Sequence, residues 1–164
     1  MYKIDAYNLA NPEYSYALCY VDSEKGALSI ISDYGNWSYL WGTQSLPKGK
    51  TFKEFLKGIS HPAYIAQKLF GGNCWEVNRE ATEKKLKGEI LEARRNLRLS
   101  QENARYLWEE LDVTEDYEGV ANELGIGDYE PEQAETCEYL KVRDHLLPDL
   151  LNALAKETVI AEAP

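Results

Sequence analysis

"SDYGNWSYLWG", residues 32–42, decides the fold of the N-terminal half, because it has the composition of a β-hairpin. The Gly-Asn pair at 35–36 is typical of two-residue hairpin turns, which need positive φ. With this turn, Tyr34 faces Trp37 across the hairpin, and period-two alternation places the aromatic rings on one face. We expect Trp37 and Trp41 to belong to the core, and Tyr34, at the tip, to stay exposed.

The same alternation predicts the rest of an N-terminal sheet. Four segments show the pattern of half-buried strands: 2–9, 14–22, 27–34 and 36–41. Two short helices follow, one with Thr51 as its N-cap and one with Pro62 in its first turn. We therefore expect residues 1–75 to form an antiparallel sheet of three or four strands packed with short helices.

In the second half of the chain the apolar period becomes helical. Ser100 and Thr114 are the expected N-caps of two helices, and Pro131 is expected to open the last and longest one. Pro148 removes a hydrogen bond inside that last helix and should kink or divide it. Its leucines, near heptad spacing, favour packing within the chain, with a homodimer as the alternative. The expected fold class is α+β, with a helical region over 76–164.

The net charge of −10 is unevenly spread along the chain. Residues 106–140 contain twelve acidic residues and neither lysine nor arginine. A solvated surface is the plainest interpretation of this acidic segment, but ordinary helix surfaces intersperse both signs of charge. Laid out as helix, the segment spans about 52 Å and carries a charge per roughly 4 Å, against one per about 3.4 Å along a DNA strand. The segment therefore predicts a surface that occupies a basic nucleic-acid channel and repels nucleic acid itself.

The residues expected to contact such a partner are ten carboxylates of this segment and two residues of the hairpin. They are Glu109, Glu110, Asp112, Glu115, Asp116, Glu118, Glu123, Asp128, Glu130, Glu132, Tyr34 and Asn36.

Chemistry-bearing motifs are scarce. No phosphate-binding glycine motif, nucleophile elbow or zinc-protease motif occurs, and His61 and His145 are too far apart to be sequence partners. Cys19, Cys74 and Cys137 form no CxxC pair and are expected to be reduced core thiols of a cytoplasmic protein. We expect no metal, no cofactor, no membrane span, no secretion signal and no catalytic residue; a carboxylate-dependent hydrolase is the less favoured alternative.

Three motifs in order support a family resemblance: "SDYGNWSYLWG", then "FKEFL", then "LSQENARYLWEEL". Over residues 28–111 the chain resembles a group of small proteins encoded in bacteriophages and prophages. The resemblance implies a phage accessory protein that acts inside a bacterial cell, and it carries over no active-site residues. The acidic segment beyond residue 111 looks like an addition of this protein.

Phage accessory proteins often inhibit host defence, and acidic imitators of nucleic acid are frequent among anti-CRISPR proteins. Joined to the charge pattern, this resemblance gives the leading hypothesis. The chain would be a non-enzymatic inhibitor that binds a host nucleic-acid-binding defence complex, such as a CRISPR–Cas effector. The alternative is a phage structural or regulatory interaction protein without a defence target.

Overall fold

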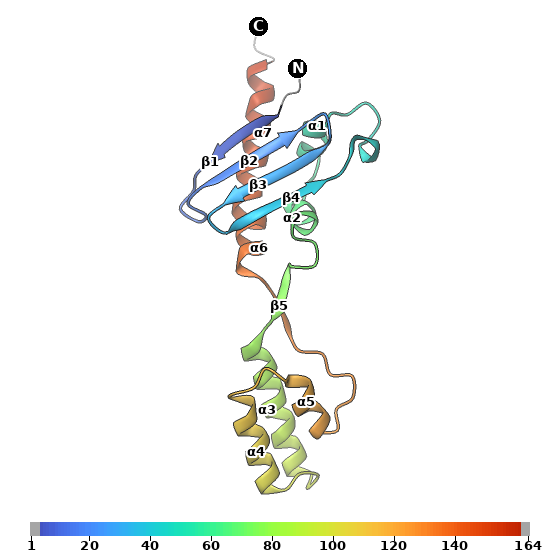
Figure 1. Cartoon of the computed structure of the whole chain (residues 1–164), viewed down its shortest axis with the longest axis vertical. Coiled ribbons are helices and arrows are strands. Elements are labelled where there is room, and N and C mark those ends of the chain that lie inside the picture. Colours follow the sequence, from blue (N-terminus) through green and yellow to red (C-terminus); the bar gives the residue numbers. More distant parts are fainter. Residues whose placement is uncertain (1–3, 162–164) are drawn as a thin grey trace. The chain divides into compact units, whose positions relative to one another are not determined.

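The chain forms two compact units in a computed structural model that describes residues 4–161, with side chains up to residue 157 (Figure 1). The sheet unit contains the chain up to Cys74 and again from Glu135 onward, and the helical unit contains Trp75–Ala134. The boundary at Cys74 lies beside the one expected after residue 75, but the chain from Glu135 onward belongs to the sheet unit and not to the helical region, because the C-terminal helix returns to pack with the N-terminal sheet. Tyr139, Val142 and Leu146 of that helix are buried in the same core as the strands.

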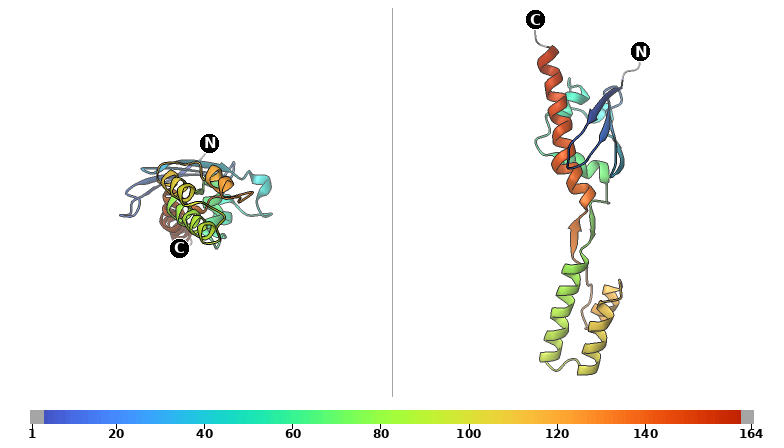
Figure 2. Two further views of the ribbon diagram at one scale, coloured as in Figure 1. Left: turned by 90° about the horizontal axis from the view of Figure 1, so that it is seen from below. Right: turned by 90° about the vertical axis from the view of Figure 1, so that its left-hand side faces the viewer.

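The sheet unit is built on four antiparallel strands in the order β1-β2-β3-β4, which confirms the expected sheet. The strands are β1 (Asp5–Leu9), β2 (Ala17–Asp22), β3 (Ala27–Ser32) and β4 (Gly35–Leu40). Figure 2 shows α7 (Leu147–Ala161) lying along one face of this sheet. Alternate residues of β2 and β3 point into that side, as period two requires. The α+β class predicted from the sequence is therefore confirmed.

The hairpin between β3 and β4 turns two residues earlier than expected. Ser32 pairs with Gly35 and Ile30 pairs with Trp37, so Asp33 and Tyr34 form the turn and the expected register is wrong. The Ser32 hydroxyl stabilises this turn: it donates to the Gly35 carbonyl oxygen at 3.2 Å and accepts from the Tyr34 N–H at 3.3 Å. The turn thus moves by two residues and the partner of Trp37 by four, from Tyr34 to Ile30; because four is even, each side chain stays on its expected face.

Two features of the hairpin favour glycine at position 35. The backbone there has a positive φ of 149°, and the neighbouring side chain leaves no room for a Cβ. A Cβ built on Gly35 would lie 2.8 Å from Cζ2 of Trp37, so the indole ring lies against the space that the glycine leaves. Trp37 in turn stacks on Phe70, with ring centroids 4.7 Å apart. Trp41 is buried, and Trp37 is half-buried against the same core, so both tryptophans belong to the core as expected.

Tyr34 does not stay exposed, and that expectation is wrong. Its side chain is half-buried, with the Lys141 ammonium nitrogen 4.0 Å from the ring centroid. The same ammonium group donates a 2.7 Å hydrogen bond to the Tyr34 hydroxyl, which raises the pKa of Lys141. The hairpin tip is therefore held to the C-terminal helix by a cation–π contact and a hydrogen bond.

Short helices complete the sheet unit. Thr51 caps α1 (Phe52–Lys57) with a full capping box, as its side chain and that of Glu54 satisfy each other's backbone N–H groups. The remaining elements are a 3₁₀ turn at Thr43–Ser45, α2 (Pro62–Phe70), α6 (Cys137–Lys141), the π-helical turn η2 (Val142–Leu146) and α7. Helix α2 begins at Pro62 and ends before Gly71, as expected.

The last helix does not begin at Pro131. Residues Gln133–Glu135 form a strand, β6, that pairs with β5 (Trp75–Val77), and Thr136 caps α6 behind it. The helical backbone continues through Pro148, but the π turn η2 directly before it separates α6 from α7, so the α-helical hydrogen bonding is interrupted next to the proline. Leu147, Leu150 and Leu154 are buried against the sheet, so the leucine spacing serves packing within the unit.

The helical unit contains three helices around a small core of its own. They are α3 (Arg79–Arg95), α4 (Gln101–Leu111) and α5 (Tyr117–Glu123), and α3 and α4 lie side by side (Figure 2). Ser100 caps α4 as expected, whereas α5 is capped by Asp116 in place of Thr114. The core consists of Leu86, Ile90, Leu107, Leu111, Tyr117, Val120 and Ala121.

All three thiols are free, and two of them are core residues. Cys19 and Cys74 are buried, and burial raises the pKa of Cys19 to about 12. Cys137 is exposed at the start of α6, which corrects the expectation that it is a core thiol.

Replacing Gly35 by alanine tests the packing of the hairpin. We expect Gly35→Ala to lower the free energy of unfolding by about 1–3 kcal/mol, because the new methyl group meets the Trp37 ring that Phe70 holds in place. Gly42→Ala is the matched control, since Gly42 also has positive φ but nothing lies within 4 Å of its built Cβ. Urea denaturation should show the larger loss for Gly35→Ala; equal losses would mean that the Trp37 contact contributes nothing.

Candidate interaction surface

Most of the negative charge belongs to the helical unit. Within residues 75–134 there are eight Lys and Arg against sixteen Asp and Glu, a net of −8. The rest of the chain has ten basic and twelve acidic residues, a net of −2. Any electrostatic function of this protein is therefore expected to reside in the helical unit.

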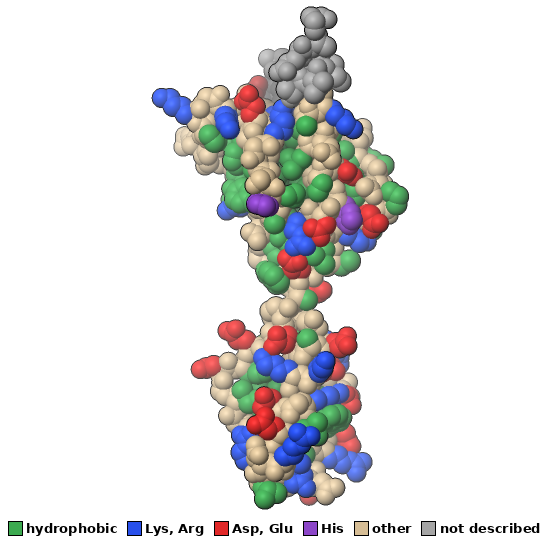
Figure 3. Space-filling view, turned by 180° about the vertical axis from the view of Figure 1, so that it is seen from behind, with side chains coloured by type: hydrophobic (Ala, Val, Ile, Leu, Met, Phe, Trp, Pro, Cys, Tyr) green, Lys and Arg blue, Asp and Glu red, His purple; other side chains and the backbone are tan. Residues whose placement is uncertain are grey.

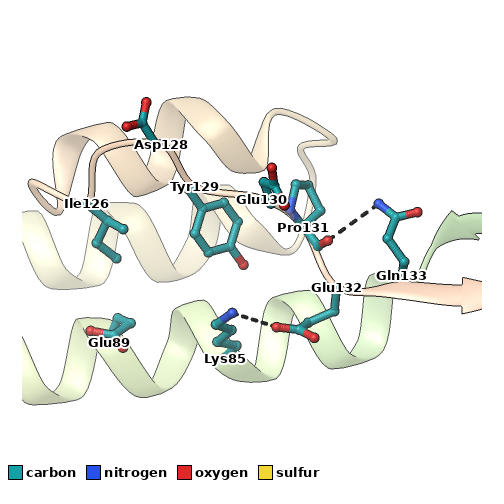
Figure 4. Close-up of a pocket in the computed structure, with 9 residues that line it drawn as sticks. All are labelled: Lys85, Glu89, Ile126, Asp128, Tyr129, Glu130, Pro131, Glu132 and Gln133. Atoms are coloured by element: carbon teal, nitrogen blue, oxygen red, sulfur yellow. Dashed lines mark hydrogen bonds and ion pairs between the residues drawn. The ribbon is translucent and has the colours of Figure 1, made fainter.

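Two open hollows lie beside the return segment, which we define as residues 126–133, from the end of α5 to β6. The first has a volume of about 530 Å³ and is lined by Lys85 and Glu89 of α3 together with the return segment itself (Figure 4). In Figure 4 the Glu132 carboxylate points to the Lys85 ammonium group, while Asp128 points away from it. The Glu132 carboxylate is thus engaged within the unit, whereas Asp128 forms no ion pair among the described residues.

The second hollow, of about 500 Å³, combines apolar and acidic side chains. Its apolar lining residues are Val77, Tyr117 and Pro131, and Arg79 is the one basic residue that lines it. Its acidic lining residues are Glu76, Glu115, Asp116 and Glu118. Pro131 lines both hollows, so the two hollows adjoin, and eight acidic side chains line one or the other. We call this set the acidic surface: Glu76, Glu89, Glu115, Asp116, Glu118, Asp128, Glu130 and Glu132.

The two basic residues of these hollows are each paired. Lys85 binds Glu132, and Arg79 binds Glu83 one helical turn away at 2.6 Å. These hydrogen bonds raise the pKa of both basic groups, since the carboxylates favour the charged form. Among the described residues, the other seven carboxylates of the acidic surface form no ion pair. The surface therefore keeps most of its negative charge.

Backbone hydrogen bonds fix the return segment against α3. The Glu132 N–H donates to the hydroxyl of buried Thr82 at 3.0 Å, and the Asn78 N–H donates to the Glu132 carbonyl oxygen at 2.8 Å. The Asn78 side chain also caps α3 by accepting from the Ala81 N–H. The Tyr129 ring lies against the Lys85 ammonium group, 5.5 Å from the ring centroid. The positions of Asp128, Glu130 and Glu132 thus follow from contacts with one helix.

Asp116 has a structural role in addition to its charge. Its carboxylate accepts from the Gly119 N–H at 2.9 Å, which caps α5, and its own N–H donates to the Thr114 hydroxyl. A built Cβ on Gly119 would lie 2.5 Å from this carboxylate, so a glycine permits the cap. Substitution of Asp116 would consequently change the helix as well as the surface.

The structure gathers only part of the predicted site. Glu115, Asp116, Glu118, Asp128, Glu130 and Glu132 lie on the acidic surface. Glu109 pairs with Arg105 at 2.8 Å and Asp112 pairs with Lys87 at 2.7 Å, so positive charges from the same unit offset them. Glu110 and Glu123 line neither hollow.

The remaining two predicted residues, Tyr34 and Asn36, belong to the sheet unit and do not join this surface. Asn36 is exposed on β4. Glu76 and Glu89 were missed, because they lie outside the acidic segment and only the fold brings them to it.

The face of the helical unit in Figure 3 shows how the charges mix. Basic and acidic side chains alternate there, so negative charge does not cover the unit evenly. Among the described residues, no group of three or more His, Cys, Asp or Glu side chains is placed to hold a metal ion. In the same part of the chain, no helix is both long and apolar enough to cross a membrane.

The bond between Thr82 and the return segment can be tested by substitution. We expect Thr82→Val to lower stability by about 1–3 kcal/mol, because the half-buried Glu132 N–H loses its acceptor, the buried Thr82 hydroxyl. Thr82→Ser keeps the hydroxyl and should cost only about 0.8 kcal/mol for the lost methyl group. Amide hydrogen exchange should show faster exchange at Glu132 in Thr82→Val alone. Unchanged exchange at that amide would contradict the assigned anchor.

Comparison with known proteins adds one finding. The profile of the phage protein family Phage_phiTE_072, described as a phage family, matches residues 4–157. No curated protein and no solved structure shows a significant match. The matched range includes the acidic segment, so the expectation that this segment is an addition beyond the shared part is wrong. Because the match spans nearly the whole chain, this protein belongs to that phage protein family.

Proposed function

We propose that this phage protein inhibits a host defence complex by binding its basic, nucleic-acid-binding surface, with a CRISPR–Cas effector as the first target to test. The acidic surface of the helical unit is the observation that carries the proposal. Eight carboxylates lie around two adjoining hollows whose only two basic residues are already paired. Such a surface attracts a Lys/Arg-lined channel and repels nucleic acid.

The second hollow suits the side chains that line such a channel. Lysine and arginine pack their apolar stems while their charged ends stay with polar groups. Val77, Tyr117 and Pro131 offer an apolar lining for the stem, and Glu115 and Glu118 offer carboxylates for the charged end. Charge-assisted hydrogen bonds to these carboxylates are stronger than neutral ones. The proposed mode of action is occupancy of the channel, without a chemical step.

The decisive experiment compares two double charge reversals of equal size. Glu115→Lys/Glu118→Lys changes the acidic surface, whereas Glu110→Lys/Glu123→Lys changes net charge equally at residues that line neither hollow. All four carboxylates lack an ion pair among the described residues, and the Asp116 cap is left intact. Bacterial strains that each carry one CRISPR–Cas type directed against the same phage provide the assay.

We expect the natural chain and the control variant to restore plaque formation in at least one strain, and Glu115→Lys/Glu118→Lys to fail there. With the purified effector of that strain, the chain should prevent binding of labelled target DNA. The inhibition should weaken steeply between 50 and 300 mM salt, as expected for charge-driven contacts. The chain alone should not shift the DNA.

Two results would contradict the proposal. Failure to restore plaques in every strain would remove the defence target and favour a structural or regulatory phage protein. Equal loss in both double variants would show that net charge, and not the acidic surface, decides binding.

A further inference from the structure

We infer that two copies of this chain associate through the outer face of α3, antiparallel and centred on Gly88. This inference does not rest on the proposed function, although Glu89 and Glu132 of the acidic surface line one of the hollows beside Gly88. It begins with Gly88, which lies in the interior of a seventeen-residue helix. A glycine at such a position lowers helix stability by up to about 1 kcal/mol relative to alanine.

Nothing within the chain explains this glycine. No atom lies within 4 Å of a Cβ built on Gly88, so a methyl group would meet open space, and its φ is not in the positive region. Two further hollows meet at this point, and both are lined by Gly88 and Lys84. A small residue on an exposed helix face lets another backbone approach closely. Gly88 is therefore placed where a second helix would cross.

Charge selects the orientation of that second helix. Lys84 and Glu92 lie four residues to either side of Gly88 on the same face, and neither forms an ion pair among the described residues. In an antiparallel pair centred on Gly88, Lys84 of each copy faces Glu92 of the other. A parallel pair would place Lys84 against Lys84, which is unfavourable. The second occupant is consequently an identical helix in the opposite direction.

Apolar side chains flank the same crossing point. Leu91 is 46% exposed and Trp108 is 36% exposed, and both line one of the hollows that meet at Gly88. In the antiparallel pair the two-fold axis is perpendicular to the helices, so Leu91 of both copies lies on the same side of the pair. There the two leucines add apolar surface to the contact at Gly88. Ala81, one heptad before Gly88, lines the other hollow and adds a second small residue along the line of contact.

The remaining charges also permit this arrangement. Helix α3 carries six Lys and Arg against four Glu, so it has a net charge of +2 within a unit whose net charge is −8. Gly88 does not line the hollow of Glu115 and Glu118, whereas Glu89 and Glu132 of the acidic surface line one of the hollows that meet at Gly88. One helix face, about 25 Å long, buries less than the ~1,200 Å² of stable complexes. The dimer is accordingly expected to be weak and dependent on concentration.

Sedimentation velocity from 5 to 500 µM tests the inference with the full chain. The natural protein should pass from monomer to dimer in this range. Gly88→Ala should weaken the dimer about tenfold, because the added methyl group separates the helices. The same variant should raise the melting temperature of the dilute monomer by up to about 4 °C, because alanine favours helix.

A charge swap separates the specific contact from any folding defect. Lys84→Glu and Glu92→Lys should each weaken the dimer, and the double swap Lys84→Glu/Glu92→Lys should restore it, since it has the same composition as the natural chain. Circular dichroism checks that all three variants keep their helical content. A chain that stays monomeric at 500 µM, a dimer that ignores Gly88→Ala, or a double swap without rescue would each overturn the inference.

Discussion

The arrangement of the helical unit depends on the contact between the return segment, residues 126–133, and α3, the first helix of the unit. Two backbone hydrogen bonds to Glu132, from its N–H to Thr82 and to its carbonyl from Asn78, fasten the return segment along α3. The same attachment starts the pairing of β5 with β6 and so closes the unit. This attachment fixes Asp128, Glu130 and Glu132 relative to α3, while Tyr117 and Val120 hold α5 in the core of the unit. The return segment is thus held by hydrogen bonds of the Glu132 backbone together with the ion pair between Lys85 and the Glu132 carboxylate.

The sequence predicted the starts of helices correctly where a single residue type has a single structural role at that position. The side chains of Thr51 and Ser100 accept hydrogen bonds from backbone N–H groups at helix starts, as expected. Pro62, which has no N–H group, lies in the first turn of α2, also as expected. Pro131 also looked like a helix start, but the residues after it pair with β5 as a strand. A proline is equally suited to an extended segment, and only the partner strand, more than fifty residues away, decides between the two.

The hairpin and the site illustrate the same limit. Gly35 looked like a turn residue because of its conformational freedom, yet its position is explained by the Trp37 ring that packs against it. The acidic segment correctly located the charge of the unit, but sequence distance cannot show which carboxylates converge. Asp112 and Glu109 are offset by Lys87 and Arg105, while Glu89 joins from another helix. Pairing of charges is decided by tertiary neighbours, so composition alone overstates the size of the surface.

Acidic and basic residues are unevenly distributed within the helical unit, and this distribution limits which partners each surface can bind. Outside α3, the unit has twelve acidic and two basic residues, whereas α3 itself is net positive. Two acidic surfaces repel each other over distances of about a Debye length, near 8–10 Å at physiological salt. An acidic surface therefore requires a partner of a different kind, and a basic channel meets that requirement. Helix α3 carries both signs of charge, so the proposed contact with its own copy is not restricted in this way; because Glu89 belongs both to α3 and to the acidic surface, the two proposed contacts adjoin on the helical unit.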